Sequence, residues 1–127
     1  MEYTGKNGLG AVIIAEEVVK TVAGMAAMDI AGVAGMSGGI AGDFTEMLGR
    51  KNISKGIKVA VGEKETAIDI FVMLDYGVRM PEVASIIQNK VKNAVEEMTG
   101  LVVVEVNIHV QGVVFPQEYK DGERRVK

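Results

Sequence analysis

The sequence contains no cysteine and no tryptophan, and its 127 residues include one histidine and two prolines. Without cysteine there is no disulfide framework, thiolate nucleophile, cysteine-ligated zinc or cysteine-held iron–sulfur cluster. With His109 as the single imidazole, a site built from several histidines needs other chains. Carboxylate, hydroxyl, lysine and backbone chemistry remain open. We expect none of them, and therefore no enzyme activity, no cofactor and no metal site.

The chain also lacks an excess of positive charge and a long apolar run. Its formal net charge of -3 argues against indiscriminate binding to nucleic acid or anionic lipid, which depends on clustered Lys and Arg. The longest apolar region, residues 22–36, is interrupted by Asp29 and three glycines, whereas a membrane span needs about 20 apolar residues. The N-terminus has no signal-peptide pattern. We expect a cytoplasmic protein.

The hydrophobic content of 48% is enough for one domain with a sizeable core. Residues 1–10 contain three glycines and few apolar side chains, so we expect a flexible N-terminal segment. Residues 11–116 form the predicted domain. Residues 117–127 are mostly polar, and we expect a disordered tail.

The first half of the domain has a helical pattern followed by glycine. Apolar residues at spacings of three and four predict a helix over residues 15–30. Residues 32–42 hold five glycines and leave three interpretations open: a short strand over 33–36, a loop, or a segment that contacts a ligand such as phosphate. A single helical turn over 43–48 and a basic connection over 49–56 follow.

The second half has stronger patterns. The residues over 57–61 and 67–76 follow a period of two, with the larger aliphatic side chains on one face, and the short polar turn between them predicts a hairpin. An apolar stripe over 81–98, from Val83 to Met98, predicts a helix that begins at Pro81 and stops at Gly100. In the strand predicted over 102–115, Val102, Val104, Val106, Ile108 and Val110 alternate with polar residues.

These elements predict an α+β fold: an antiparallel sheet of three or four strands with two main helices, in the order helix, short strand, hairpin, helix, strand. A crossover helix brings the last strand back in the direction of the second hairpin strand. We expect the last strand beside the first hairpin strand, giving the order 2-1-3. The later helix then packs on Ile68, Ile70, Val72 and Leu74. For the opposite face, with Phe71 and Met73, we expect cover by the first helix; the alternative is a patch that a partner covers.

Four segments resemble a known family: EEVVKTVAGMAAMDIAGVAGM, GIKVAV, IDIFVMLDYG and the run from Pro81 to Phe115, which leads through Met98-Thr99-Gly100-Leu101 into a Val-Asn-Ile-His-Val strand. Together they resemble the alkaline shock protein family, small bacterial proteins linked to alkaline shock and the cell-envelope stress response. The resemblance covers residues 8–115. It implies a non-enzymatic cytoplasmic protein, and in some members a peripheral position at the inner membrane through a separate anchoring protein. It supplies no catalytic residues.

The candidate site residues are therefore contact residues. Four basic residues without an intervening acid, Arg50, Lys51, Lys55 and Lys58, are candidates for contact with an anionic partner. They define the alternative function, a small RNA-binding module that uses the 50–58 loop. Phe71, Met73 and His109 are candidates for a protein interface. The preferred function is a non-catalytic interaction protein of the envelope or alkaline stress response. The long, Val-rich last strand predicts a homo-oligomer, because an uncovered edge pairs readily.

Overall fold

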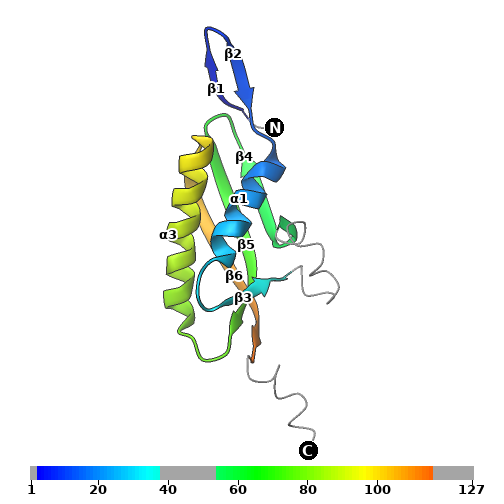
Figure 1. Cartoon of the computed structure of the whole chain (residues 1–127), viewed down its shortest axis with the longest axis vertical. Coiled ribbons are helices and arrows are strands. Elements are labelled where there is room, and N and C mark those ends of the chain that lie inside the picture. Colours follow the sequence, from blue (N-terminus) through cyan, green and yellow to red (C-terminus); the bar gives the residue numbers. More distant parts are fainter. Residues whose placement is uncertain (1–2, 38–53, 116–127) are drawn as a thin grey trace, which may run out of the picture.

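The computed structural model describes residues 3–37 and 54–115. In this part of the chain, two helices lie on one face of a four-stranded sheet, and a separate hairpin projects from one end of it (Figure 1). The α+β class, the four-strand sheet and the two main helices are confirmed. The predicted tail over 117–127, the helical turn over 43–48 and residues 38–42 of the glycine-rich stretch lie outside the described residues.

The sheet is organised around β5 (Glu65–Asp75). Strands β4 (Ile57–Val61) and β3 (Val33–Met36) pair antiparallel with β5, β4 opposite residues 66–70 and β3 opposite residues 72–74, so they share one edge. Strand β6 (Val102–Val114) pairs with β5 along its whole length on the other edge. The hairpin of β4 and β5 is as expected, and residues 33–36 form the strand that was one of the interpretations left open.

The position of β6 differs from the expected order. The last strand does run in the direction of the second hairpin strand, but it lies parallel beside β5 and not beside β4. Strand β4 has five residues, too few to pair with the 13 residues of β6, whereas β5 has 11. With β3 and β4 occupying one edge of β5, its other edge remains open along its full length for the longer strand.

Two irregularities in β6 also change which of its side chains face the core. The register passes from Thr66 opposite Val103 to Ala67 opposite Glu105, and it slips again at Gln111. One extra residue in a strand reverses the alternation of side chains. Val103 is therefore buried, whereas Val102 and Val104, expected on the same side as Val106, are 51% and 54% exposed.

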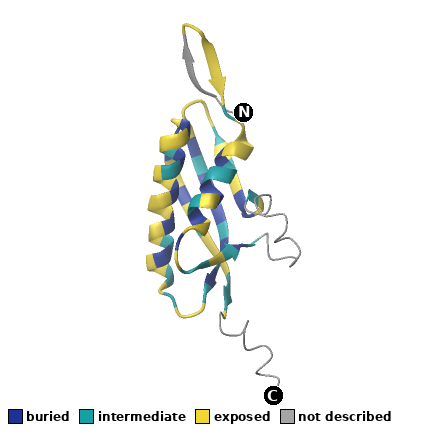
Figure 2. Ribbon diagram, in the orientation of Figure 1, coloured by how far each residue is buried: buried dark blue, intermediate teal, exposed yellow. Residues whose placement is uncertain are grey.

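The helices α1 (Glu16–Met28) and α3 (Met80–Thr99) pack on the same face of the sheet. The predicted stripe of α3 is buried at every fourth residue, and Figure 2 shows its exposed side turned outward. Thr99 occupies the last buried position, and Met98, expected in the stripe, is 72% exposed. The core contains the expected face of β5 with both helices: Val19, Ala23, Ala27, Ile68, Ile70, Val72, Leu74, Val83, Ile87, Val91 and Val95.

The expectation that the first helix covers Phe71 and Met73 is wrong. The buried residues of α1 include Ala23, Gly24 and Ala27. Small side chains allow close approach, so α1 lies beside α3 on the side of the sheet that α3 already covers. We call the opposite side the open face; neither α1 nor α3 covers it.

The N-terminal residues form a hairpin that the sequence does not predict. Strands β1 (Tyr3–Asn7) and β2 (Gly10–Ile13) pair antiparallel, and all four residues of β2 are exposed. Glycine lowers strand propensity, and β2 has no buried residue that would give a period of two. The segment that we expected to be flexible has regular structure from residue 3.

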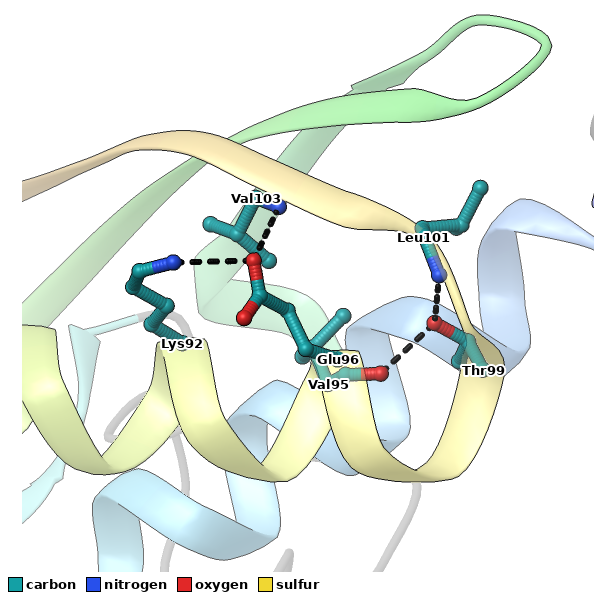
Figure 3. A network of polar contacts seen from close by, with 6 residues as sticks. All are labelled: Lys92, Val95, Glu96, Thr99, Leu101 and Val103. Atoms are coloured by element: carbon teal, nitrogen blue, oxygen red, sulfur yellow. Dashed lines mark hydrogen bonds and ion pairs between the residues drawn. The ribbon is translucent and has the colours of Figure 1, made fainter.

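A polar network joins the end of α3 to the start of β6 (Figure 3). Gly100 ends the helix with φ of 82°, as its place after the stripe predicts. The Thr99 hydroxyl donates to the Val95 carbonyl at 2.6 Å and accepts from the Leu101 N–H at 3.1 Å. One carboxylate oxygen of Glu96 accepts from the Val103 N–H at 2.9 Å and from Lys92 at 2.8 Å. These bonds, with that of Lys92 first, lower the pKa of Glu96.

Replacing Thr99 by Val tests this junction. The change keeps the shape of the side chain but leaves the buried Leu101 N–H without its acceptor, which costs about 1–2 kcal/mol. Urea denaturation measures the loss. Thr99→Ser keeps the hydroxyl and is the matched control, so equal losses in both variants would contradict the role given to the hydroxyl.

A second prediction concerns Gly56, at the end of η3 (Ser54–Gly56). An added Cβ there lies 2.9 Å from the Phe71 carbonyl oxygen and 3.0 Å from the Met36 Cβ. Because the first of these is backbone, Gly56→Ala is expected to destabilise the fold by about 1–3 kcal/mol in urea denaturation. Gly62→Ala is the control, since its nearest atom is 3.7 Å away. A loss of stability at Gly62 as large as that at Gly56 would contradict the prediction.

Candidate interaction site on the open face

A row of three side chains crosses the open face from one strand to the next. Phe71 on β5 is opposite His109 on β6, and their rings stack with centroids 4.3 Å apart and planes 9° from parallel. The Lys58 ammonium, from β4, lies 5.5 Å from the Phe71 centroid. Because β4 and β6 lie on opposite edges of β5, Lys58 and His109 approach the Phe71 ring from opposite sides. The row therefore ties three strands together.

Asp69 supports this row from the same face of β5. Its Oδ1 lies 3.1 Å from His109 Nε2, and since a carboxylate only accepts, the imidazole donates. The hydrogen bond from His109 is the main reason that the pKa of Asp69 lies below its ordinary value; a hydrogen bond from Asn107 and the charge of Lys58 act in the same direction. The result is a half-exposed cluster that holds a carboxylate in its charged form.

A second contact spans the open face near the end of β5. Ser37, just after β3, donates to the Gln111 side-chain oxygen at 3.2 Å. Met73 lies over Gly112, where an added Cβ would be 2.6 Å from the Met73 Cε. Met73 thus fills the space that a side chain at Gly112 would occupy, and it is half-buried.

The structure brings most of the predicted contact residues together. Phe71, Met73 and His109 share the open face, and Lys58 lies with them over the Phe71 ring. Lys55 is exposed in η3, whereas Arg50 and Lys51 lie outside the described residues. The predicted basic loop therefore contributes one residue, Lys58, to the row.

Sequence reasoning missed Asp69 and Asn107 as members of the cluster. The alternation of β6 does place Asn107 on the face of His109. The pairing of β6 with β5, which brings Asp69 within reach, depends on the strand order. That order has no signature in a single sequence.

The cluster offers apolar, cationic and hydrogen-bonding groups at one place on the open face. Among residues 8–37 and 54–115, no group of three His, Cys, Asp or Glu side chains could hold a metal ion. The imidazole is 43% exposed, its Nε2 bonds to Asp69 and one ring face stacks on Phe71. An aromatic pair with a cation and a carboxylate offers apolar area and directional polar groups together, which is typical of contact residues in protein interfaces.

Comparison with known proteins agrees with the resemblance noted in the sequence. Residues 4–115 match the model of the alkaline shock protein 23 family, whose description is a cell envelope-related function. The chain belongs to the alkaline shock protein 23 family. The expected membership is thereby confirmed, and with it the link to the cell envelope.

Relatives of the chain come from bacteria. It is 41% identical over 106 residues to the uncharacterized protein YloU of Bacillus subtilis, covering 82% of this chain and 88% of YloU. To the uncharacterized protein YqhY of the same species it is 38% identical over 107 residues, covering 84% and 79%. A Streptococcus pyogenes protein named stress response regulator gls24 homolog is 26% identical over 106 residues, covering 83% and 59%.

No solved structure gives a significant match to the chain. In the part of the chain that is described, neither α1 nor α3 is long and apolar enough to cross a membrane.

Replacing Asp69 by Asn tests the cluster through pH. Because the pKa of Asp69 is lower in the folded chain, its charged carboxyl stabilises the fold at every pH above the pKa in the unfolded chain, about 3.9. This stabilisation is lost as pH falls through the lower pKa of the folded chain. At pH 7 we expect Asp69→Asn to cost less than about 1 kcal/mol, because the pair is partly exposed. Urea denaturation should show wild type and variant converging below about pH 4.

The control is the same substitution in a His109→Ala background. With the principal hydrogen-bond donor removed, the cost of Asp69→Asn at pH 7 should be smaller. An undiminished cost would show that His109 is not the main partner of Asp69.

Proposed function

We propose that this protein is a non-catalytic interaction protein of the cell-envelope or alkaline stress response, acting through protein–protein contacts on the open face. The observation that carries the proposal is the row of Lys58, Phe71 and His109 on the sheet face that neither helix covers. Membership of a family with a cell envelope-related function supports the proposed link to the cell envelope. The S. pyogenes relative named a stress response regulator supports the proposed part in a stress response.

The proposed partners are further copies of the chain and other proteins, with a membrane-anchoring protein as one candidate. In this proposal the protein is cytoplasmic, either free or held at the inner membrane by that partner. A protein held at the membrane by a partner needs no membrane-spanning helix of its own, and neither described helix is long and apolar enough to be one. Aromatic side chains on a flat, half-exposed face favour a protein surface over a small molecule, which needs a concave site.

The alternative, an RNA-binding module using the 50–58 loop, has less support. Proteins that bind single-stranded nucleic acid stack its bases on the exposed faces of aromatic side chains. The two faces of the Phe71 ring are directed toward His109 and Lys58. The open face also carries Asp69, Asp75 and Glu105, which repel phosphate.

Affinity purification from alkali-stressed cells tests the proposal. The wild-type chain should recover specific proteins, and a Phe71→Thr/His109→Thr variant should recover on the order of tenfold less of them, because central aromatic residues dominate interface energies. Mass spectrometry of the eluates measures both. Thr suits the strand positions, so the fold is expected to persist, and circular dichroism verifies this.

The matched control is Met98→Gln, which changes an apolar side chain on α3 that is 72% exposed and should leave partner recovery unchanged. Recovery of the chain alone, or equal recovery with the double variant, would contradict the proposal. Nuclease-sensitive RNA in the eluate that is lost in a Lys55→Ala/Lys58→Ala variant would support the alternative.

A further inference from the structure

Strand β6 has a strand neighbour on one edge only within the described residues. It pairs with β5, and no other described strand pairs with it. In a strand, the backbone groups of successive residues point to alternate edges. The Val106 carbonyl accepts from the Gln88 side chain at 2.9 Å, so Val106 points to the outer edge. By the same alternation, Ile108 and Val110 point outward too.

Side chains of α3 cap the first half of this outer edge. Glu96 binds the Val103 N–H at 2.9 Å, and Gln88 binds the Val106 carbonyl. No described side chain or strand caps the outward backbone groups of Ile108 and Val110. At Gln111 the register slips, which ends the regular edge. The uncapped stretch is therefore short, running from the residue after Val106 to Gln111.

Between Val106 and the irregularity at Gln111, this edge lacks the usual protection against pairing. Natural edge strands are protected against pairing by charged residues, proline or bulges. From Val106 to Phe115 the sequence has no Asp, Glu, Lys or Arg, and proline comes only at position 116. Two copies of such a strand can therefore lie side by side without placing two charges of the same sign opposite each other. Val110 is also 37% exposed, so apolar area remains to be covered.

We propose that a second copy of the chain pairs on this edge, antiparallel and centred on His109. In this register, Ile108 lies opposite Val110 of the second copy and Val110 opposite Ile108, so all the uncapped outward groups are paired. Centring on Ile108 would pair Val110 with Val106, whose carbonyl is already bound to Gln88. Centring on Val110 would pair Ile108 with Gly112, beyond the slip in register.

The pairing has a consequence for the open face. The two sheets become one continuous sheet, and the two open faces lie on the same side of it. His109 of each copy lies at the two-fold axis, directly opposite the other. The stacked rings of Phe71 and His109 in one copy then continue into those of the second copy. This inference specifies the self-association included in the proposed function, but the contact with other proteins does not require it.

Cysteine cross-linking tests the register, because a chain without cysteine gives a variant with a single thiol. Residues opposite each other in a non-hydrogen-bonded antiparallel pair have Cα atoms about 4.5 Å apart, within the range for a disulfide. Purified His109→Cys is therefore expected to form a disulfide dimer under mild oxidation, on the order of tenfold faster than colliding chains do. Non-reducing electrophoresis measures the rate.

Asn107→Cys is the matched control, two residues along the same face. In the proposed register its equivalent in the second copy is four residues away, about 13 Å, so it should cross-link only at the collision rate. A mixture of Asn107→Cys with Gln111→Cys should cross-link faster than Asn107→Cys alone, because these positions lie opposite each other in the mixed dimers. That mixture keeps His109 and its stacking intact.

Equal rates for His109→Cys and Asn107→Cys, or no fast cross-link in either His109→Cys or the mixture, would overturn the proposal. As an independent measurement, light scattering of the wild-type chain at micromolar concentration should give a dimer or larger species, and Val110→Lys should shift it to the monomer. A wild-type monomer would overturn it as well. These experiments use the purified chain alone, so their failure leaves the recovery of other proteins by the open face untouched.

Discussion

Strand β5 is paired on both edges, and this pairing determines how the other elements are arranged. The side chains of a strand point alternately to the two faces of the sheet. In β5 this alternation divides the side chains between the face that the helices cover and the open face. Ile68, Ile70, Val72 and Leu74 are all fully buried on one side. Asp69, Phe71 and Met73 are left on the other. Each later feature, from the helix layer to the open face, depends on that division.

The placement of both helices on one side decides which side chains of the sheet reach the surface. Had α1 packed on Phe71 and Met73, the sheet would be the middle of three layers and would present no face. Ala23, Gly24 and Ala27 let α1 lie beside α3, and the molecule has two layers. The cluster of Lys58, Asp69, Phe71 and His109 then lies at the surface, with its charges paired internally and its rings half-exposed. Such a cluster stabilises the sheet and is accessible to a partner.

The sequence predicts the elements well because each has a local signature. The four-residue spacing from Val83 to Val95 predicts α3, Gly100 predicts its end, and the alternation over 57–61 predicts β4. The strand order, the irregularities at Val104 and Gln111, and the side on which α1 packs depend on contacts between distant residues. For the same reason Phe71 and His109 could be named as contact residues, whereas their partner Asp69 could not. The N-terminal hairpin was missed because its strand β2 is exposed throughout and has no apolar alternation.

We propose that this protein meets other proteins on its open face, and the single histidine allows a direct measurement. Diethyl pyrocarbonate modifies accessible imidazoles, and peptide mass mapping reports the modification at His109 alone, whose side chain is 43% exposed. We expect rapid modification of His109 in the dilute, isolated chain and marked protection in the complex recovered from stressed cells. Equal modification in the two samples would contradict it.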